Sequence, residues 1–126
     1  MTTSIKLISS MATRQLLADL VARYRTETGV AVEVESVGGV DAAKRVEAGE
    51  VFDGVVLACG AIDKLIASGK VLAPRIDIVD SGVAVAVPAG AARPDLSDEA
   101  AVKQAVLAAP TLGYSTGPSG VALAQL

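Results

Sequence analysis

Hydroxyl residues and glycines gather near the end of the sequence, over residues 113–120. Residues 110–112 before this loop read as the end of a strand, and the apolar residues after it read as the opening of a helix. Pro118 suits the first turn of such a helix, because its missing N–H group has no partner there in any case. The remaining backbone N–H groups and the helix dipole can hold an anion without a cationic side chain. The candidate ligand groups of this loop are Ser115, Thr116, Ser119 and Gly120.

Three earlier stretches have a similar composition, each lying between a strand pattern and a helix pattern. They are the pairs Ser9-Ser10, Gly38-Gly39 and Ala58-Cys59. Taken alone, any one of these connections between a strand and a helix is explained by an ordinary helix cap with turn glycines. Ligands of parallel sheets, however, bind outside the carboxyl ends of the strands, where all three pairs would meet. The recurrence therefore indicates a site for a small anion, with Ser9, Ser10, Gly38, Gly39 and Cys59 as further candidates.

The strand and helix patterns alternate along the first half of the chain. We expect strands over residues 4–8, 30–36 and 53–58, and helices over residues 11–28, 41–48 and 61–68. Connections of one helix each predict right-handed βαβ units, and hence an α/β fold with a three-layer αβα arrangement and a mostly parallel sheet. The nearly continuous apolar run 53–58 is typical of a central strand, whereas the alternating run 30–36 favours a place near a sheet edge.

The sequence changes character after residue 75. Residues 76–87 form an extended apolar segment, interrupted by Ser81 and Gly82, and we expect its second part to be a strand. Residues 88–94 are rich in proline, glycine and alanine, a composition typical of a linker. Ser97 then suits the N-cap of a helix that runs to about residue 109.

Composition excludes several kinds of chemistry. The absence of histidine removes Ser-His-Asp and Cys-His nucleophiles and the usual zinc ligand sets, so no metal or cofactor is expected. Cys59 is the single cysteine of the sequence, and we expect a reduced, partly buried thiol. We expect this thiol to line the cleft that holds the anion, without acting as a nucleophile. Aromatic residues make up 2% of the chain and the net charge is −3, so nucleic acid is not an expected partner.

The chain is unusually apolar, with 52% hydrophobic residues and a mean hydropathy of +0.52. No run of about 18 uncharged apolar residues appears, so the excess fits a sheet buried on both faces rather than a membrane span. The first residues lack the basic and apolar regions of a secretory signal. We expect the chain as written to be cytoplasmic, or periplasmic if a signal has been removed.

Residues 6–69 resemble the first half of a type II periplasmic binding protein, in the molybdate-binding-protein-like subgroup. The residues that carry this resemblance are Lys6-Leu7-Ile8-Ser9-Ser10, Tyr24, Thr28-Gly29-Val30, Val46-Glu47-Ala48-Gly49, Phe52-Asp53 and Ile62-Asp63-Lys64-Leu65. Residues 81–88 resemble the crossover strand into the second lobe of that family, and residues 113–120 resemble a second-lobe loop that helps to hold the ligand. The resemblance implies a first lobe over residues 1–80 and an incomplete second lobe over residues 81–126, which we interpret as a truncation.

In that family an oxyanion lies between two lobes, held by hydroxyls and backbone amides. The resemblance implies first-lobe contacts from Ser9 or Ser10 and from the Gly38-Gly39 joint, and second-lobe contacts from Ser81 and residues 115–120. The sequence departs from the family pattern twice. Ala12 stands where the first ligand serine is expected, and two glycines stand where molybdate binders have serines. A small carboxylate or another oxyanion is therefore as good a ligand as molybdate, and an ABC transporter permease is the implied partner.

Two other functions fit the same scaffold. One is an isomerase of a small tricarboxylate such as aconitate, for which the candidate bases are Asp41, Lys44, Cys59 and Tyr114. Each of these residues also has a structural explanation, as a cap, a solvated charge, a small buried residue or a loop residue. The other is the effector-sensing half of a regulator, which needs a DNA-binding segment in addition. A second lobe too small to bury its apolar faces also predicts self-association of the chain.

Overall fold

The computed structural model describes residues 3–125 of the 126-residue chain. Contacts between Cα atoms divide the chain into two compact units, Met1–Val79 and Asp80–Leu126. None of the helices within residues 3–125 is long and apolar enough to cross a membrane.

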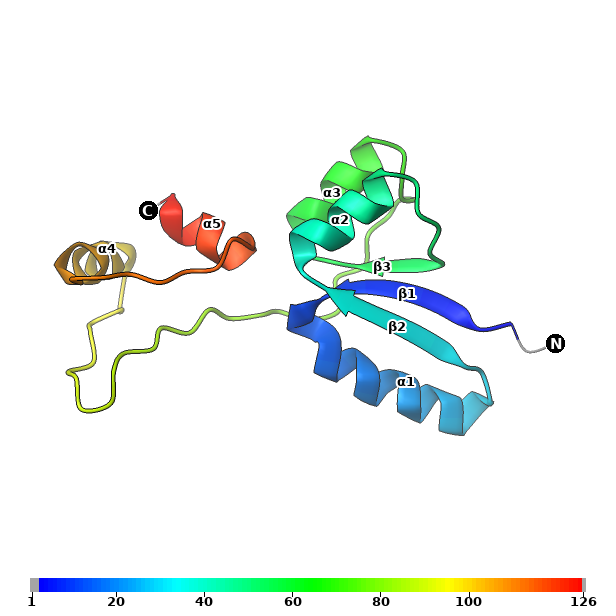
Figure 1. The fold of residues 1–126 in the computed structure, drawn as a ribbon, viewed down its shortest axis with the longest axis horizontal. Coiled ribbons are helices and arrows are strands. Elements are labelled where there is room, and N and C mark those ends of the chain that lie inside the picture. Colours follow the sequence, from blue (N-terminus) through cyan, green and yellow to red (C-terminus); the bar gives the residue numbers. More distant parts are fainter. Residues whose placement is uncertain (1–2, 126) are drawn as a thin grey trace. The chain divides into compact units, whose positions relative to one another are not determined.

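The first unit is built from three strand–helix repeats, as the alternating patterns predicted (Figure 1). Its elements are β1 (Ile5–Ser10), the 3-10 helix η1 (Met11–Thr13), α1 (Arg14–Thr28), β2 (Val32–Val37), α2 (Gly39–Glu47), β3 (Gly54–Val56) and α3 (Cys59–Ala67). Gly29 ends α1 with φ of 75°, a left-handed conformation that glycine adopts without steric cost. The three strands form a parallel sheet, and helices flank it on both faces. The expected α/β fold class is therefore confirmed.

The order of the strands in the sheet is β2-β1-β3. The expected edge position of residues 30–36 is right, because β2 pairs with β1 alone among the described strands. The expected central position of residues 53–58 is wrong, because β1 takes that place. The chain moves from β1 to β2 on one side and then crosses to β3 on the other, so right-handed connections put α1 on one face and α2 on the opposite face (Figure 1). α3 lies beside α2 on that second face.

The core of this unit lies between the sheet and the α2–α3 layer. Ile8 of β1 and Ala42 of α2 are fully buried, and Val46 and Leu65 are at most 5% exposed. Five partly buried side chains pack around them, from Val37, Phe52, Val55, Leu57 and Val71. On the opposite face, Leu17 is the buried residue of α1, so the apolar side of that helix is only partly covered.

The second unit contains α4 (Glu99–Ala108) and α5 (Pro118–Ala124). The strand expected over residues 83–87 and the strand end expected at residues 110–112 are wrong, because neither stretch is a strand in the structure. A strand requires a hydrogen-bonded neighbour, and the sheet of the described residues contains only β1, β2 and β3. Val83 and Val85 are instead 67% and 54% exposed.

The start of α4 also differs from its prediction. Asp98, not Ser97, is the N-cap, and its carboxylate accepts a hydrogen bond of 2.7 Å from the Ala101 N–H group. The Ser97 N–H group donates to Asp95 at 3.0 Å, which holds Ser97 in the turn before the helix. An ionised carboxylate accepts such bonds more strongly than a hydroxyl does, so the neighbouring aspartate becomes the cap.

Candidate functional site

Three helix starts lie along the carboxyl edge of the sheet. Ser10 pairs in register with Val37, and Ser9 pairs with Val56, so the three strands end side by side. The chain then enters η1 through Ser10, α2 through Gly38 and α3 through Ala58. None of these three N-cap residues, all within the described part of the chain, accepts a side-chain hydrogen bond from the turn that follows. Their first-turn N–H groups therefore have no capping side chain.

Ser10 and the Gly38-Gly39 joint are brought together at this edge. A Cβ atom on Gly39 would lie 3.5 Å from the Cβ atom of Ser10, so the end of β1 directly adjoins the start of α2. The Ser10 side chain is half-buried and has no hydrogen bond of its own among the described contacts. One hydroxyl donor and the amides of a helix start are thus neighbours, which is a suitable arrangement for holding an oxyanion.

Ser9 has a different environment from Ser10. Its side chain is fully buried, its hydroxyl donates to the Ser10 carbonyl at 3.0 Å, and its oxygen lies 2.7 Å from the Ser36 hydroxyl. Each hydroxyl has one proton, so Ser36 supplies the proton of the bond between the two serines. This network leaves Ser9 no proton for a solute and links β1 to β2 at their carboxyl ends.

Cys59 is exposed, which corrects the expectation of a partly buried thiol at the end of a strand. The reason is that β3 ends at Val56, and Cys59 is the first residue of α3 instead. Its thiol forms no disulfide in the structure.

Of the candidate bases, Asp41 lies in the first turn of α2 at the candidate edge. Its Oδ2 atom is 3.5 Å from the position that a Cβ atom on Gly38 would occupy. A carboxylate here stabilises the helix start, accepts hydrogen bonds and repels a fully ionised solute. Lys44 belongs to the last turn of α2, away from this edge, and Tyr114 is 62% exposed in the second unit.

The sequence analysis missed three residues near this edge. Ser36 follows Val32 and Val34 at the spacing of one strand face, a signal that could have predicted its buried hydroxyl bond. Thr13 is the N-cap of α1, and its hydroxyl oxygen is buried without a hydrogen-bond partner in residues 3–125. Arg14 lies with Ser36 along an open groove of about 380 Å³, which Ala18, Val34 and Glu35 complete.

The second group of candidates belongs to the second unit. Ser81 is exposed in the segment without secondary structure. Ser115 and Ser119 are linked through their hydroxyls at 2.9 Å, and Thr116 between them is exposed. A Cβ atom on the buried Gly120, in the first turn of α5, would overlap the Ser115 carbonyl oxygen, so this position requires glycine. The residues just before α5 therefore pack closely against the first turn of that helix.

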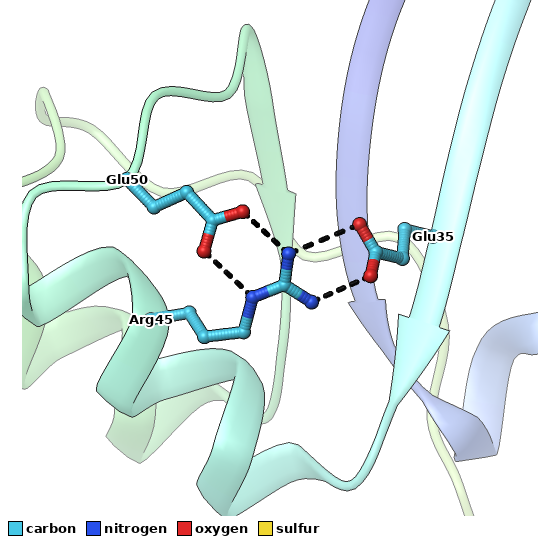
Figure 2. A network of polar contacts seen from close by, with 3 residues as sticks. All are labelled: Glu35, Arg45 and Glu50. Carbon is cyan, nitrogen blue, oxygen red and sulfur yellow. Dashed lines mark hydrogen bonds and ion pairs between the residues drawn. The ribbon is translucent and has the colours of Figure 1, made fainter.

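Arg45, in the last turn of α2, is the centre of an ion-pair network (Figure 2). Its guanidinium donates to both oxygens of Glu35 at 2.6 and 3.1 Å, to Glu50 Oε2 at 2.7 Å and also to Glu50 Oε1. It also lies 5.5 Å from the centre of the Phe52 ring. The hydrogen bonds from Arg45 lower the pKa of both glutamates. Because all these donors are engaged, Arg45 joins α2 to β2 and is not free to bind a solute anion.

Residues 3–125 contain no group of three or more acidic residues and cysteine placed to hold a metal ion. The polar groups of the candidate site are backbone amides, hydroxyls and one carboxylate.

Residues 5–126 match the family model of the bacterial extracellular solute-binding proteins. The chain belongs to this family. The expected resemblance to periplasmic binding proteins is confirmed at the level of the family. An aconitate isomerase from a Pseudomonas species is 33% identical over 130 residues, which cover 98% of this chain and 50% of the relative. The chain thus spans about half the length of that curated relative.

Proposed function

We propose that the chain binds a small anionic solute, an oxyanion or a carboxylate, at the carboxyl edge of the first unit. The observation that carries this proposal is that three helix starts without a side-chain cap hydrogen bond lie along one edge of the sheet, with the Ser10 side chain beside Gly39. Amides and hydroxyls at helix starts stabilise negative charge through directed hydrogen bonds. Gly38, Gly39 and Ser10 are the first-unit contacts of this proposal.

Five residues of the second unit remain candidate ligand groups by their residue types alone. They are Ser81, Ser115, Thr116, Ser119 and Gly120. Membership of a solute-binding family supports the further proposals that an ABC transporter permease receives the solute and that the protein works outside the cytoplasm. Molybdate is one oxyanion within this class. Because Gly38 and Gly39 stand where molybdate binders have serines, a small carboxylate is an equally good candidate ligand.

Calorimetric titration of the chain with molybdate, sulfate, phosphate, citrate and aconitate tests the proposal. One charge-assisted hydrogen bond contributes about 1.5–3 kcal/mol, so Ser10→Ala and Ser119→Ala should each weaken binding of the preferred anion by roughly ten- to a hundredfold. Ser4→Ala is the matched control, because Ser4 lies just before β1 at the opposite edge of the sheet. Binding that neither site substitution weakens would locate the site elsewhere.

A second candidate function is the isomerisation of aconitate. The named relative, an aconitate isomerase, supports it, and so does the Asp41 carboxylate at the same edge, which is suited to remove a proton from a carbon atom of a bound tricarboxylate and to return it to another carbon atom. Incubation with either aconitate isomer, followed by proton NMR, measures the activity. Conversion that Asp41→Asn abolishes while aconitate binding persists would favour this function over binding alone.

A further inference from the structure

The segment that leaves the first unit is not held by apolar packing. Val71 is the last of its residues that packs against the core. After it, Leu72 is 90% exposed, Ile76 is 81% exposed and Ile78 is 55% exposed. Residues 73–79 have no helix or strand. Polar contacts are then the interactions that can hold this segment against the first unit.

One arginine provides such a contact. The Arg75 Nη1 atom donates to both carboxylate oxygens of Asp63 in α3, at 2.6 and 2.7 Å. Its Nε atom donates to Asp77 at 2.9 Å. A single guanidinium thus joins the helix to two positions of the segment that follows it. Both carboxylates raise the Arg75 pKa further above its ordinary value, so the charge of this contact is permanent.

The position of the contact relative to the unit boundary is the informative feature. The boundary falls between Val79 and Asp80, shortly after Asp77, and the small residues Ser81 and Gly82 come next. We propose that Asp63, Arg75 and Asp77 form a latch that holds the segment on α3 and fixes the start of the flexible connection at Asp80. Without the latch, the flexible connection begins directly after Val71.

The latch is sensitive to salt, since its members lie at the surface. The Arg75 side chain is 36% exposed, and those of Asp63 and Asp77 are 55% and 71% exposed. The Arg75–Asp63 pair is the one that joins the segment to α3, and one exposed ion pair of this kind shifts a local equilibrium by about two- to fivefold. Ionic strength above that of physiological solutions screens such a pair further. The segment therefore exchanges between held and released states, and dissolved salt changes the ratio of the two.

Spin labelling of residue 78 tests the latch. The label is attached to Ile78→Cys in a Cys59→Ser background, and electron paramagnetic resonance spectra are recorded at low protein concentration. We expect mainly a restricted spectral component, and Arg75→Gln should raise the ratio of mobile to restricted component about two- to fivefold. Molar sodium chloride should produce the same change in the parent protein and little in the variant.

Two further variants make the result specific. Arg93→Gln removes an exposed arginine of the second unit and should leave the spectrum unchanged. Asp63→Asn removes only the contact to α3 and should mobilise the label, so a folding defect in one variant does not decide the outcome. Equal label mobility in the parent, Arg75→Gln and Asp63→Asn proteins would overturn the latch.

Discussion

Ser9 and Ser10 are neighbours in the sequence, yet their side chains lie on opposite faces of β1. Ser10 shares its face with the buried Ile8 and adjoins α2, while Ser9 is fully buried against Ser36. Two adjacent serines therefore have two tasks, one at the candidate edge and one in the link between strands. The residue types at the end of β1 do not distinguish the two serines. The two-residue period of the strand does distinguish them, because it places neighbouring side chains on opposite faces.

Replacing Ser9 by alanine should destabilise the first unit without removing a ligand contact. The substitution leaves the Ser36 hydroxyl and the Ser10 carbonyl without their buried partner, at a cost of about 1–3 kcal/mol. Urea unfolding measures this as a lower midpoint with an unchanged slope. Ser4→Ala should leave the midpoint in place, and an equal midpoint for Ser9→Ala would show that the network is not stabilising.

At the scale of the elements, the alternation of strands and helices could be predicted because each has its own apolar period. Residues 53–58 were given the wrong place in the sheet, since burial of a strand on both faces does not show which neighbours it has. Residues 83–87 have the pattern of a strand, but pairing depends on partners that a local pattern does not contain. Thr13 was missed because its significance comes from burial of its oxygen, which spacing does not show.

The Arg45 network makes the stability of the α2–β2 contact dependent on pH. Arg45 holds the pKa values of Glu35 and Glu50 below their ordinary value of 4.5 in the folded chain. Carboxyls with a lowered folded pKa stabilise the fold above the unfolded pKa, and this contribution disappears as the pH falls through the folded pKa. Arg45→Met should therefore lower the urea midpoint clearly at pH 7. The decrease should be much smaller at a pH below the folded-state pKa values of Glu35 and Glu50, where both carboxyls are protonated.

A matched arginine is available as a control for this comparison. Among residues 3–125, Arg23 pairs only with Glu27 along the exposed side of α1, at 2.8 Å, and both side chains are more than half exposed. Arg23→Met should change the midpoint little at either pH. An Arg45→Met effect that is equal at both pH values would indicate lost packing against Phe52 rather than lost ion pairing.

Two glycines, Gly120 in the first turn of α5 and Gly113 in the loop before it, provide a test of this region. Gly120→Ala would drive a Cβ atom into the Ser115 backbone, where the carbonyl carbon lies 2.7 Å away, so the loop must open at a cost of about 1–3 kcal/mol. The Ser115–Ser119 bond should then be lost, and backbone NMR shifts of both serines should move. Gly113→Ala has no atom within 4 Å of its new Cβ and should leave these shifts unchanged.

At the scale of the whole molecule, exposed apolar residues are the dominant surface feature. Large examples are Ile76, Val83, Leu107 and Val121, which are between 52% and 81% exposed. Apolar surface of this extent promotes association. Extended segments outside a sheet also expose backbone N–H and C=O groups that can form hydrogen bonds with another chain.

We therefore expect the 126-residue chain to self-associate, through exchange of the part after Ser81 between copies, and to bind anions weakly in that form. Light scattering across a dilution series should show a mass that rises with concentration. A monomer with a cooperative thermal transition would contradict this prediction and show that these residues form a complete domain.

The central position of β1 also has a consequence for the order in which the first unit forms during synthesis. The contact between Ser9 and Ser36 closes 27 residues, and that between Lys6 and Asp53 closes 47. The entropy of loop closure differs by only about 0.5 kcal/mol between these lengths, so it does not favour either pairing strongly. β3, however, ends 19 residues after β2. At about 5–20 residues per second, the ribosome gives β1, α1 and β2 roughly one to four seconds to assemble before β3 is complete. β3 then docks on the free side of β1, an edge that is already in place when the strand emerges.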